Sequence, residues 1–181
     1  MLFTEMPALD HPDAMLRPLY PDDILAWHDY LILPQVYRHT SWNVRCSSEL
    51  EHYAWQPEQF TEVSALRFAI ADSRDDHLLG TAGFHTVATV NASAEIAYDL
   101  SPAAQGRGIA RAACASLLAW GHGHLGLARI QATVLPENAR SIQVLERCGF
   151  QREGLLRSYR KVRGPSRDFW MYSHIAEGGN A

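Results

Sequence analysis

One stretch limits what this chain can fold into more than any other. In residues 100–120, LSPAAQGRGIARAACASLLAW, an apolar run leads through a glycine turn into a second apolar run. Gly106 and Gly108 permit positive φ angles and close backbone approach, so successive N–H groups can converge at the start of the helix that follows. Because a helix N-terminus attracts anions, the turn predicts a phosphate site with Arg107 and Arg111 at its rim. An ordinary strand-to-helix turn with solvated arginines is the alternative.

The rest of the chain alternates between strand and helix patterns. Residues 66–72, 78–87 and 93–100 alternate as strands do, and residues 24–33 have helical spacing that ends at Pro34. Further expected elements are a short helix within 47–60, a helix over 108–121, a strand over 128–135, a helix over 137–148, and strands over 150–162 and 167–175. This order predicts a mixed α/β fold whose central strands are antiparallel neighbours.

Composition narrows the class of protein. The 181 residues carry a net charge of −4 and are 47% hydrophobic, which predicts a single domain over 1–181 with a loose lead-in over 1–14. This charge gives no general attraction to nucleic acid or to an anionic membrane. Cys46, Cys114 and Cys148 lack metal-binding spacing and are typical of reduced thiols. With no apolar run of about 18 residues and no signal pattern, we expect a cytoplasmic monomer or homodimer.

Two sequence motifs point to one family. Gln105, Gly108 and Ala110 fit the pattern Q-x-x-G-x-A, and residues 136–150, PENARSIQVLERCGF, follow with the pattern Asn-x-x-Ser and then Gly-Phe. In this order the two motifs resemble the acetyl-CoA site of GNAT-type N-acetyltransferases. The closest likeness is to the RimJ/RimL-like branch, the ribosomal-protein N-terminal acetyltransferases and their relatives. The resemblance covers nearly the whole chain, including RDFWMYSHI near its end.

The resemblance implies a GNAT-type fold with a mixed, largely antiparallel central sheet flanked by helices. Two parallel strands, 95–100 and 129–135, would splay apart, and the pantetheine arm of acetyl-CoA would pair with the backbone groups left open. No metal is implied. The residues expected to contact the cofactor are Tyr98, Asp99, Leu100, Gln105, Gly106, Arg107, Gly108, Ile109, Ala110, Arg111, Asn138 and Ser141.

Glu95 is the candidate general base, because the family often places a glutamate on the strand before the phosphate turn. An α-amine with a pKa of about 8 is more often neutral at pH 7 than a lysine amine with a pKa of about 10.4, so a weaker base is enough to deprotonate it. The alternative is an ordinary exposed carboxylate. Asp99 shares the same face of the strand by alternation, so the pair could also attract a cationic substrate.

Ser141 is the candidate proton donor to the departing thiolate, as the resemblance to the ribosomal branch implies. Asn138 would contact the pantetheine arm, although both residues are also good helix N-caps. Many GNAT enzymes use a tyrosine as this acid. Residues 138–150 contain none, which leaves Tyr98 and Tyr159 as more distant alternatives.

The acceptor pocket is expected to be lined by Tyr37, Trp42, Phe84 and His85, with core packing as the alternative for each aromatic ring. The segment 35–60 holds further aromatic residues. The basic run 157–164 is expected to be a solvated strand edge, or to meet the 3′-phosphate of CoA or an acidic acceptor. His122 and His124, without a third ligand nearby, do not predict zinc.

Three functions remain open. The first is direct acetylation of an α-amine of a protein or peptide by acetyl-CoA, without an acyl-enzyme. The second is acetylation of a small-molecule amine such as a polyamine, an amino acid or an antibiotic. The third is an acyl-CoA-binding module without catalysis.

Overall fold

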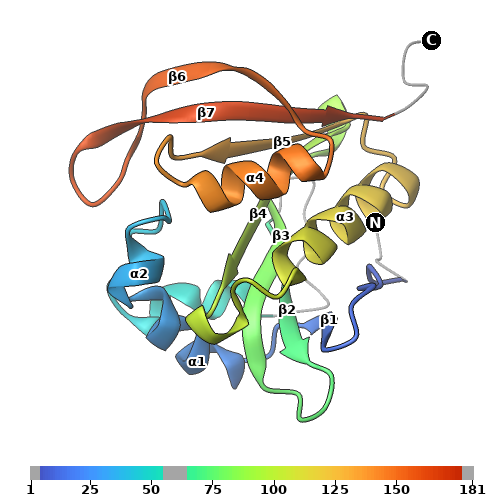
Figure 1. Cartoon of the computed structure of the whole chain (residues 1–181), viewed down its shortest axis with the longest axis vertical. Coiled ribbons are helices and arrows are strands. Elements are labelled where there is room, and N and C mark those ends of the chain that lie inside the picture. The colour runs from blue at the N-terminus through green and yellow to red at the C-terminus, as the bar shows by residue number, and fades with distance from the viewer. Residues whose placement is uncertain (1–4, 55–64, 177–181) are drawn as a thin grey trace.

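The computed structural model describes residues 5–54 and 65–176, which build a seven-stranded sheet in the order β1-β2-β3-β4-β5-β7-β6 (Figure 1). Neighbouring strands are antiparallel except β4 and β5, which are parallel. The strands are β1 (Ala14–Pro18), β2 (Leu66–Asp72), β3 (Leu78–Ala88), β4 (Ser93–Leu100), β5 (Arg129–Val134), β6 (Gln151–Lys161) and β7 (Ser166–Ile175). The predicted mixed, largely antiparallel fold is therefore confirmed.

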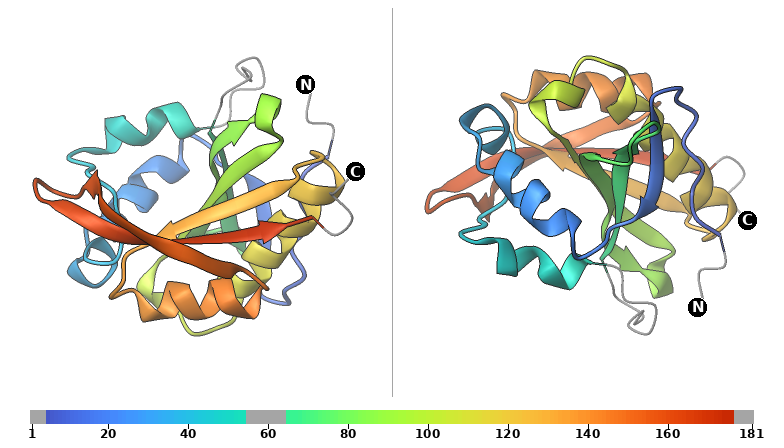
Figure 2. Two further views of the ribbon diagram at one scale, coloured as in Figure 1. Left: turned by 90° about the horizontal axis from the view of Figure 1, so that it is seen from above. Right: turned by 90° about the horizontal axis from the view of Figure 1, so that it is seen from below.

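Helices cover both faces of the sheet (Figure 2). The α-helices are α1 (Asp23–Leu31), α2 (Pro34–Tyr37), α3 (Ile109–Gly123) and α4 (Ala139–Arg147), and the 3₁₀ helices are η1 (Ser47–Tyr53), η2 (Thr89–Asn91) and η3 (Pro102–Ala104). One hydrophobic core joins the sheet to α3, and a second lies around Trp27 of α1 and Leu50 of η1. Alternation along β4 sends Ile96 into the first core and turns Glu95 to the other face.

Two local expectations need correction. Pro34 ends α1 but also begins α2, as the first helical residue, where its missing N–H costs nothing. The expected helix within 47–60 is a 3₁₀ helix over Ser47–Tyr53, and the remainder, including Trp55 and Phe60, lies outside the described residues.

The described part of the N-terminal segment, residues 5–13, is not a loose lead-in. It lies along α3, which donates hydrogen bonds from Ser116 Oγ to the carbonyl oxygen of Ala8 at 2.6 Å and from Trp120 Nε1 to that of Glu5 at 3.1 Å. Residues 5–13 have no periodic pattern, so their sequence does not predict this packing. The side chains that hold the segment, Ser116 and Trp120, belong to α3.

The parallel pairing between β4 and β5 is short. Its register runs only through Ser93 with Arg129, Ala94 with Ile130, and Glu95 with Gln131. Beyond this point both strands continue but no longer pair (Figure 2). The predicted splay of these two strands is thus confirmed, and its backbone groups need other partners.

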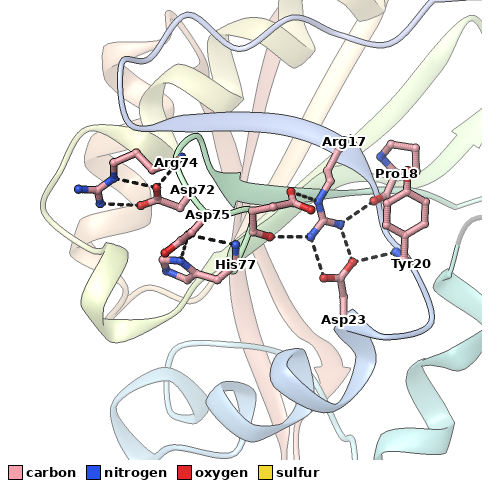
Figure 3. Close-up of polar contacts among 9 residues, drawn as sticks. Arg17, Pro18, Tyr20, Asp23, Asp72, Arg74, Asp75 and His77 are labelled. Atoms are coloured by element: carbon pink, nitrogen blue, oxygen red, sulfur yellow. Dashed lines mark hydrogen bonds and ion pairs between the residues drawn. The ribbon is translucent and has the colours of Figure 1, made fainter.

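A guanidinium anchors the other end of the sheet (Figure 3). Arg17 of β1 donates two hydrogen bonds to the carboxylate of Asp23, at 2.6 and 2.9 Å, and a third to Asp76 Oδ1 at 2.7 Å. A further bond runs from the backbone N–H of Tyr20 to the same Asp23 carboxylate. The start of α1, strand β1 and the β2–β3 turn are therefore fixed to one another.

Gly83 of β3 is a point of close approach between strands. It stands opposite Arg67 of β2 and Ala97 of β4 in the register. A Cβ atom at this position would lie 1.9 Å from the carbonyl oxygen of Leu66. Glycine is therefore required for β2, β3 and β4 to pack at this point, opposite Arg67.

The variant Gly83→Ala should lower the free energy of unfolding by about 3 kcal/mol or more, because the backbone must move to admit the methyl group. Gly123→Ala, in α3, is the matched control, since its Cβ meets no other part of the described chain within 4 Å. Urea denaturation followed by circular dichroism measures both. Equal stability of the two variants would contradict the close approach.

Candidate active site

The splay between β4 and β5 opens into a cavity of about 480 Å³. Residues 95–98 of β4 and residues 132–135, at and just after the end of β5, line its two sides. The start of α4, the segment 39–43 and side chains from β2, β3, β6 and β7 also line it. Unpaired strand backbone inside a cavity is a ready partner for the amide groups of an extended ligand. The cavity therefore suits an extended ligand that carries amide groups.

The glycine turn lies at the start of α3. Gly106 has a φ of +77° and Gly108 a φ of +83°, and α3 runs from Ile109 over 15 residues. A Cβ at Gly106 would meet nothing within 4 Å, and one at Gly108 only the His11 ring at 4.0 Å. The turn is thus open above the unsatisfied N–H groups and positive dipole end of α3, which suits a diphosphate.

Side chains of the turn are held by neighbouring elements. Gln105 donates to the carbonyl oxygen of Leu100 at 3.2 Å and accepts from Arg140 of α4 at 2.7 Å. Arg107 pairs with Asp13 at 3.2 Å. The turn therefore offers an anion mainly its backbone, and Gln105 supports the shape of the turn.

Glu95, the candidate base, is buried and lines the cavity. Its Oε1 accepts hydrogen bonds from Thr133 of β5 at 2.6 Å and from Arg160 of β6 at 2.8 Å, and its Oε2 accepts from Arg160 at 3.0 Å. A carboxylate has about four lone-pair directions, so a further donor can still be accepted. The alternative of an ordinary exposed carboxylate is wrong.

Arg160 was missed as a site residue. The run 157–164 does form part of the edge strand β6, as expected, but β6 bulges between Leu156 and Arg160, where Ser158 has a φ of +54°. The bulge turns Arg160 toward Glu95. Simple alternation along a strand cannot predict which face a residue takes after a bulge.

A second bulge places His85. The register of β3 with β4 shifts between Phe84 and Thr86, so His85 is the extra residue and lines the cavity near Glu95. Desolvation by the surrounding protein lowers the pKa of His85, and the nearby carboxylate of Glu95 opposes this effect. Burial therefore disfavours the charged imidazolium, and His85 is a neutral polar group in this cavity at neutral pH.

The start of α4 brings three polar side chains together. Asn138 is the N-cap, and its Oδ1 accepts from the backbone N–H of Ser141 at 3.2 Å. The hydroxyl of Tyr98 lies 2.9 Å from Ser141 Oγ, and both residues line the cavity. Burial raises the pKa of Tyr98, so it remains a phenol. Tyr98 is thus a direct neighbour of Ser141, closer than the sequence analysis expected.

The side chain of Asp99 is absent from the cavity lining and is engaged by other side chains. It forms a buried ion pair with Arg67 and also accepts hydrogen bonds from Trp27 Nε1 and Thr81 Oγ1, each at 3.1 Å. Arg67 in turn donates to the carbonyl oxygen of Ala97, which lines the cavity. The expectation that Asp99 attracts a cationic substrate is therefore wrong, because its charge is already matched.

Other predicted contacts lie elsewhere. Phe84 is fully buried and stacks on Trp120 of α3, and Tyr37 lies beneath the guanidinium of Arg163 at 4.0 Å; neither lines the cavity. Leu100 and Ile109 belong to the hydrophobic core. The predictions for Phe84 and Tyr37 fail because ring type does not reveal which face of the fold a residue takes.

Trp42 does line the cavity, and it belongs to the segment 40–43, which residues 161–163 hold in place. Arg163, after β6, donates to the carbonyl oxygens of Thr40 and Trp42 at 3.1 and 3.0 Å. Asn43 donates to the carbonyl oxygen of Lys161 and accepts from the backbone N–H of Arg163. We call these contacts between 40–43 and 161–163 the clasp.

One group of possible metal ligands occurs among the described residues, namely Asp72, Asp75 and His77 at the β2–β3 turn (Figure 3). Arg74 donates to both carboxylate oxygens of Asp72 at 3.0 Å, and this hydrogen bonding holds the pKa of Asp72 below its usual value. His122 contacts His174 and the carbonyl oxygen of Leu127.

In the part of the chain described, no helix is both long and apolar enough to cross a membrane.

A profile of the family described as "Acetyltransferase (GNAT) domain" matches residues 14–151, which contain both the glycine turn and the start of α4. The chain belongs to the GNAT acetyltransferase family. "Uncharacterized N-acetyltransferase p20" of Bacillus licheniformis is 43% identical over 112 residues, 62% of this chain and 63% of that protein. The ribosomal protein uS5-alanine N-acetyltransferase of Escherichia coli (strain K12) is 29% identical over 132 residues, 69% of this chain and 68% of that protein.

The chain spans 63% of p20 and 66% of YoaA of Bacillus subtilis, less than two thirds of each. Solved GNAT structures share its fold over more of its length. A ribosomal-protein-S5-alanine acetyltransferase from Vibrio fischeri has a TM-score of 0.79 at 20% identity, covering 96% of this chain and 99% of that chain. A spermidine N-acetyltransferase from Vibrio cholerae, in complex with CoA and spermine, has a TM-score of 0.78 at 23% identity, covering 91% and 96%.

Two thiols lie between α3 and α4, behind Tyr98. Cys114 is buried in α3, and Cys148 follows α4 with its Sγ 3.6 Å from the carbonyl oxygen of Arg111. A hydrogen bond from the Cys114 thiol, together with the charge of Arg111, lowers the pKa of Cys148 to about 7, and the same hydrogen bond raises the pKa of Cys114.

Alkylation of Cys148 by iodoacetamide should rise with pH and be half-maximal near pH 7, because the thiolate is the reactive form. Cys114→Ala removes the hydrogen bond and should move this midpoint toward about 8.5, the value of a free cysteine. Peptide mass spectrometry after short exposures at a series of pH values measures the rate at this one site. The same midpoint in both proteins would contradict the assigned hydrogen bond.

Proposed function

We propose that this protein transfers the acetyl group of acetyl-CoA directly to a primary amine, namely the α-amino group of a protein or peptide. The observation that carries the proposal is the placement of two groups in one cavity. The Glu95 carboxylate stands on one strand of the splay and the Ser141 hydroxyl at the start of α4. A base for the amine and an acid for the leaving thiolate are the two proton-transfer groups that this reaction needs.

Main-chain groups would hold the cofactor. In the proposal, the Gly106–Gly108 turn and the N-terminus of α3 bind the diphosphate, and residues 96–98 and 132–134 pair with the pantetheine amides. When bound, the thioester supplies the acetyl group. One backbone N–H near Tyr98 would stabilise the oxyanion that develops on its carbonyl.

Glu95 acts on the acceptor. An α-amine with a pKa of about 8 is partly neutral at pH 7, so the base needs only to remove a proton through a water molecule. Thr133 and Arg160 fix the carboxylate in place.

Ser141 acts on the thiolate. Its Oγ can donate a proton to the sulfur and regain one from solvent, while it accepts a hydrogen bond from the neighbouring Tyr98 hydroxyl. Because burial keeps Tyr98 protonated, this donor is present throughout the physiological pH range. Tyr98 would therefore orient Ser141.

Charge at the cavity supports a peptide α-amine over a polyamine. Among the described residues, its lining carries the cations Arg67, Arg160 and Lys161 and one carboxylate, that of Glu95. Arg67 is matched by Asp99, and Arg160 by Glu95, so Lys161 leaves an excess of positive charge. A polycation would be repelled, whereas an amine followed by neutral or acidic groups would be tolerated.

Incubation with acetyl-CoA should acetylate a neutral peptide with a free N-terminus at its α-amine. The same peptide with a blocked N-terminus and an internal lysine should react at least about tenfold more slowly, because its amine is far less often neutral. Mass spectrometry with fragmentation locates the acetyl group. Acetylation of spermidine in place of either peptide would overturn the assignment of the acceptor while keeping that of the chemistry.

Glu95→Gln should lower kcat by about 100-fold at pH 7, and Ser141→Ala by about tenfold, because each removes a proton-transfer group. Both should bind acetyl-CoA as tightly as the unaltered protein, measured by titration calorimetry. Glu51→Gln, at an exposed glutamate on η1, is the matched control for the first variant. An unchanged kcat for Glu95→Gln would remove Glu95 as the base.

A further inference from the structure

The N-terminal segment 5–13 runs past α3 before it enters β1, and so brings its last residues to the glycine turn (Figure 2). His11 is the point of contact. Its Nε2 lies 3.0 Å from the carbonyl oxygen of Arg107, and its Nδ1 lies 3.2 Å from the backbone N–H of Asp13. Both ring nitrogens are therefore engaged with backbone groups.

These partners fix the tautomer of His11. A backbone N–H can only donate, so Nδ1 of the ring is the acceptor and carries no proton. A carbonyl oxygen can only accept, so Nε2 is the donor to Arg107. One tautomer, with its proton on Nε2, satisfies both contacts.

The hydrogen bond to the Arg107 carbonyl sets the orientation of the next N–H. In a planar trans peptide the C=O and the following N–H point in opposite directions. His11 holds the Arg107 carbonyl toward the N-terminal segment, and the N–H of Gly108 must point away from that segment. Gly108 is the N-cap of α3 and has a φ of +83°, and because glycine has a wide range of φ and ψ, its own torsions restrain this peptide little.

The segment 5–13 makes a second contact with Arg107. Asp13 pairs with the guanidinium of Arg107 at 3.2 Å, but both side chains are partly exposed. Such a surface pair contributes little to stability. It limits the positions of the arginine side chain, whereas His11 limits the peptide itself.

We propose that His11 is a positioning residue for the diphosphate cradle, which it preorganises by holding the Arg107–Gly108 peptide in the anion-binding orientation. The inference rests on the proposed function, because it assumes that this turn binds the diphosphate of CoA. His11 does not contact the ligand in this role, since its only N–H is given to Arg107. Preorganisation raises affinity by removing a cost of ordering on binding.

The variant His11→Ala should raise the dissociation constant of acetyl-CoA about tenfold, the effect of losing roughly one hydrogen bond's contribution to binding. Its dissociation constant for S-acetylpantetheine, which lacks the diphosphate, should stay within twofold of the unaltered protein. His11→Gln should restore most of the affinity, because its amide can donate to Arg107 and accept from Asp13. His77→Ala, at an exposed histidine on the β2–β3 turn, is the matched control.

Titration calorimetry with both thioesters tests the inference, and kcat at saturating acetyl-CoA should not change in His11→Ala. Equal weakening of both ligands would show a general structural effect and overturn the positioning role, as would unchanged affinity for acetyl-CoA. If the unaltered protein binds acetyl-CoA but acetylates no amine, the proposed catalysis fails and the cradle inference stands. If it binds no acetyl-CoA, both fail together.

Discussion

The early end of the pairing between β4 and β5 is the constraint on which the rest of the site depends. After Glu95 and Gln131 the two strands share no further register, so the sheet consists of one half built by β1 to β4 and another built by β5, β7 and β6. Backbone groups on both sides of the gap require partners. The candidate base bridges this gap, because Glu95 of β4 is held by Thr133 of β5 and by Arg160 of β6.

Local patterns in the sequence predicted the elements around this gap. Strict alternation predicted β4 over its full length, 93–100, and the glycine turn predicted the start of α3 to within one residue. The Asn-x-x-Ser spacing predicted that Asn138 and Ser141 lie together, and the N-cap hydrogen bond joins them. These features could be read because each depends on neighbours only a few residues away.

What the sequence did not reveal depends on contacts between distant segments. Arg160 and His85 face the cavity because β6 and β3 bulge, and a bulge reverses the alternation on which face assignment relies. Asp99 lies on the predicted face, yet Arg67, which lies on a different strand, neutralises it. The approach of His11 to the glycine turn likewise joins segments 96 positions apart.

The clasp has an evolutionary consequence. Its contacts, from Arg163 and Asn43, mostly end on main-chain atoms of the facing segment, and backbone atoms persist when side chains change. Side chains in the clasp segments that make none of these contacts, such as that of Lys161, can therefore be substituted while the backbone of the clasp keeps its shape. None of these four hydrogen bonds involves a residue of the glycine turn, so such substitutions can leave that turn unchanged. A chain built in this way can acquire a new acceptor by a few surface substitutions without having to evolve its chemistry again.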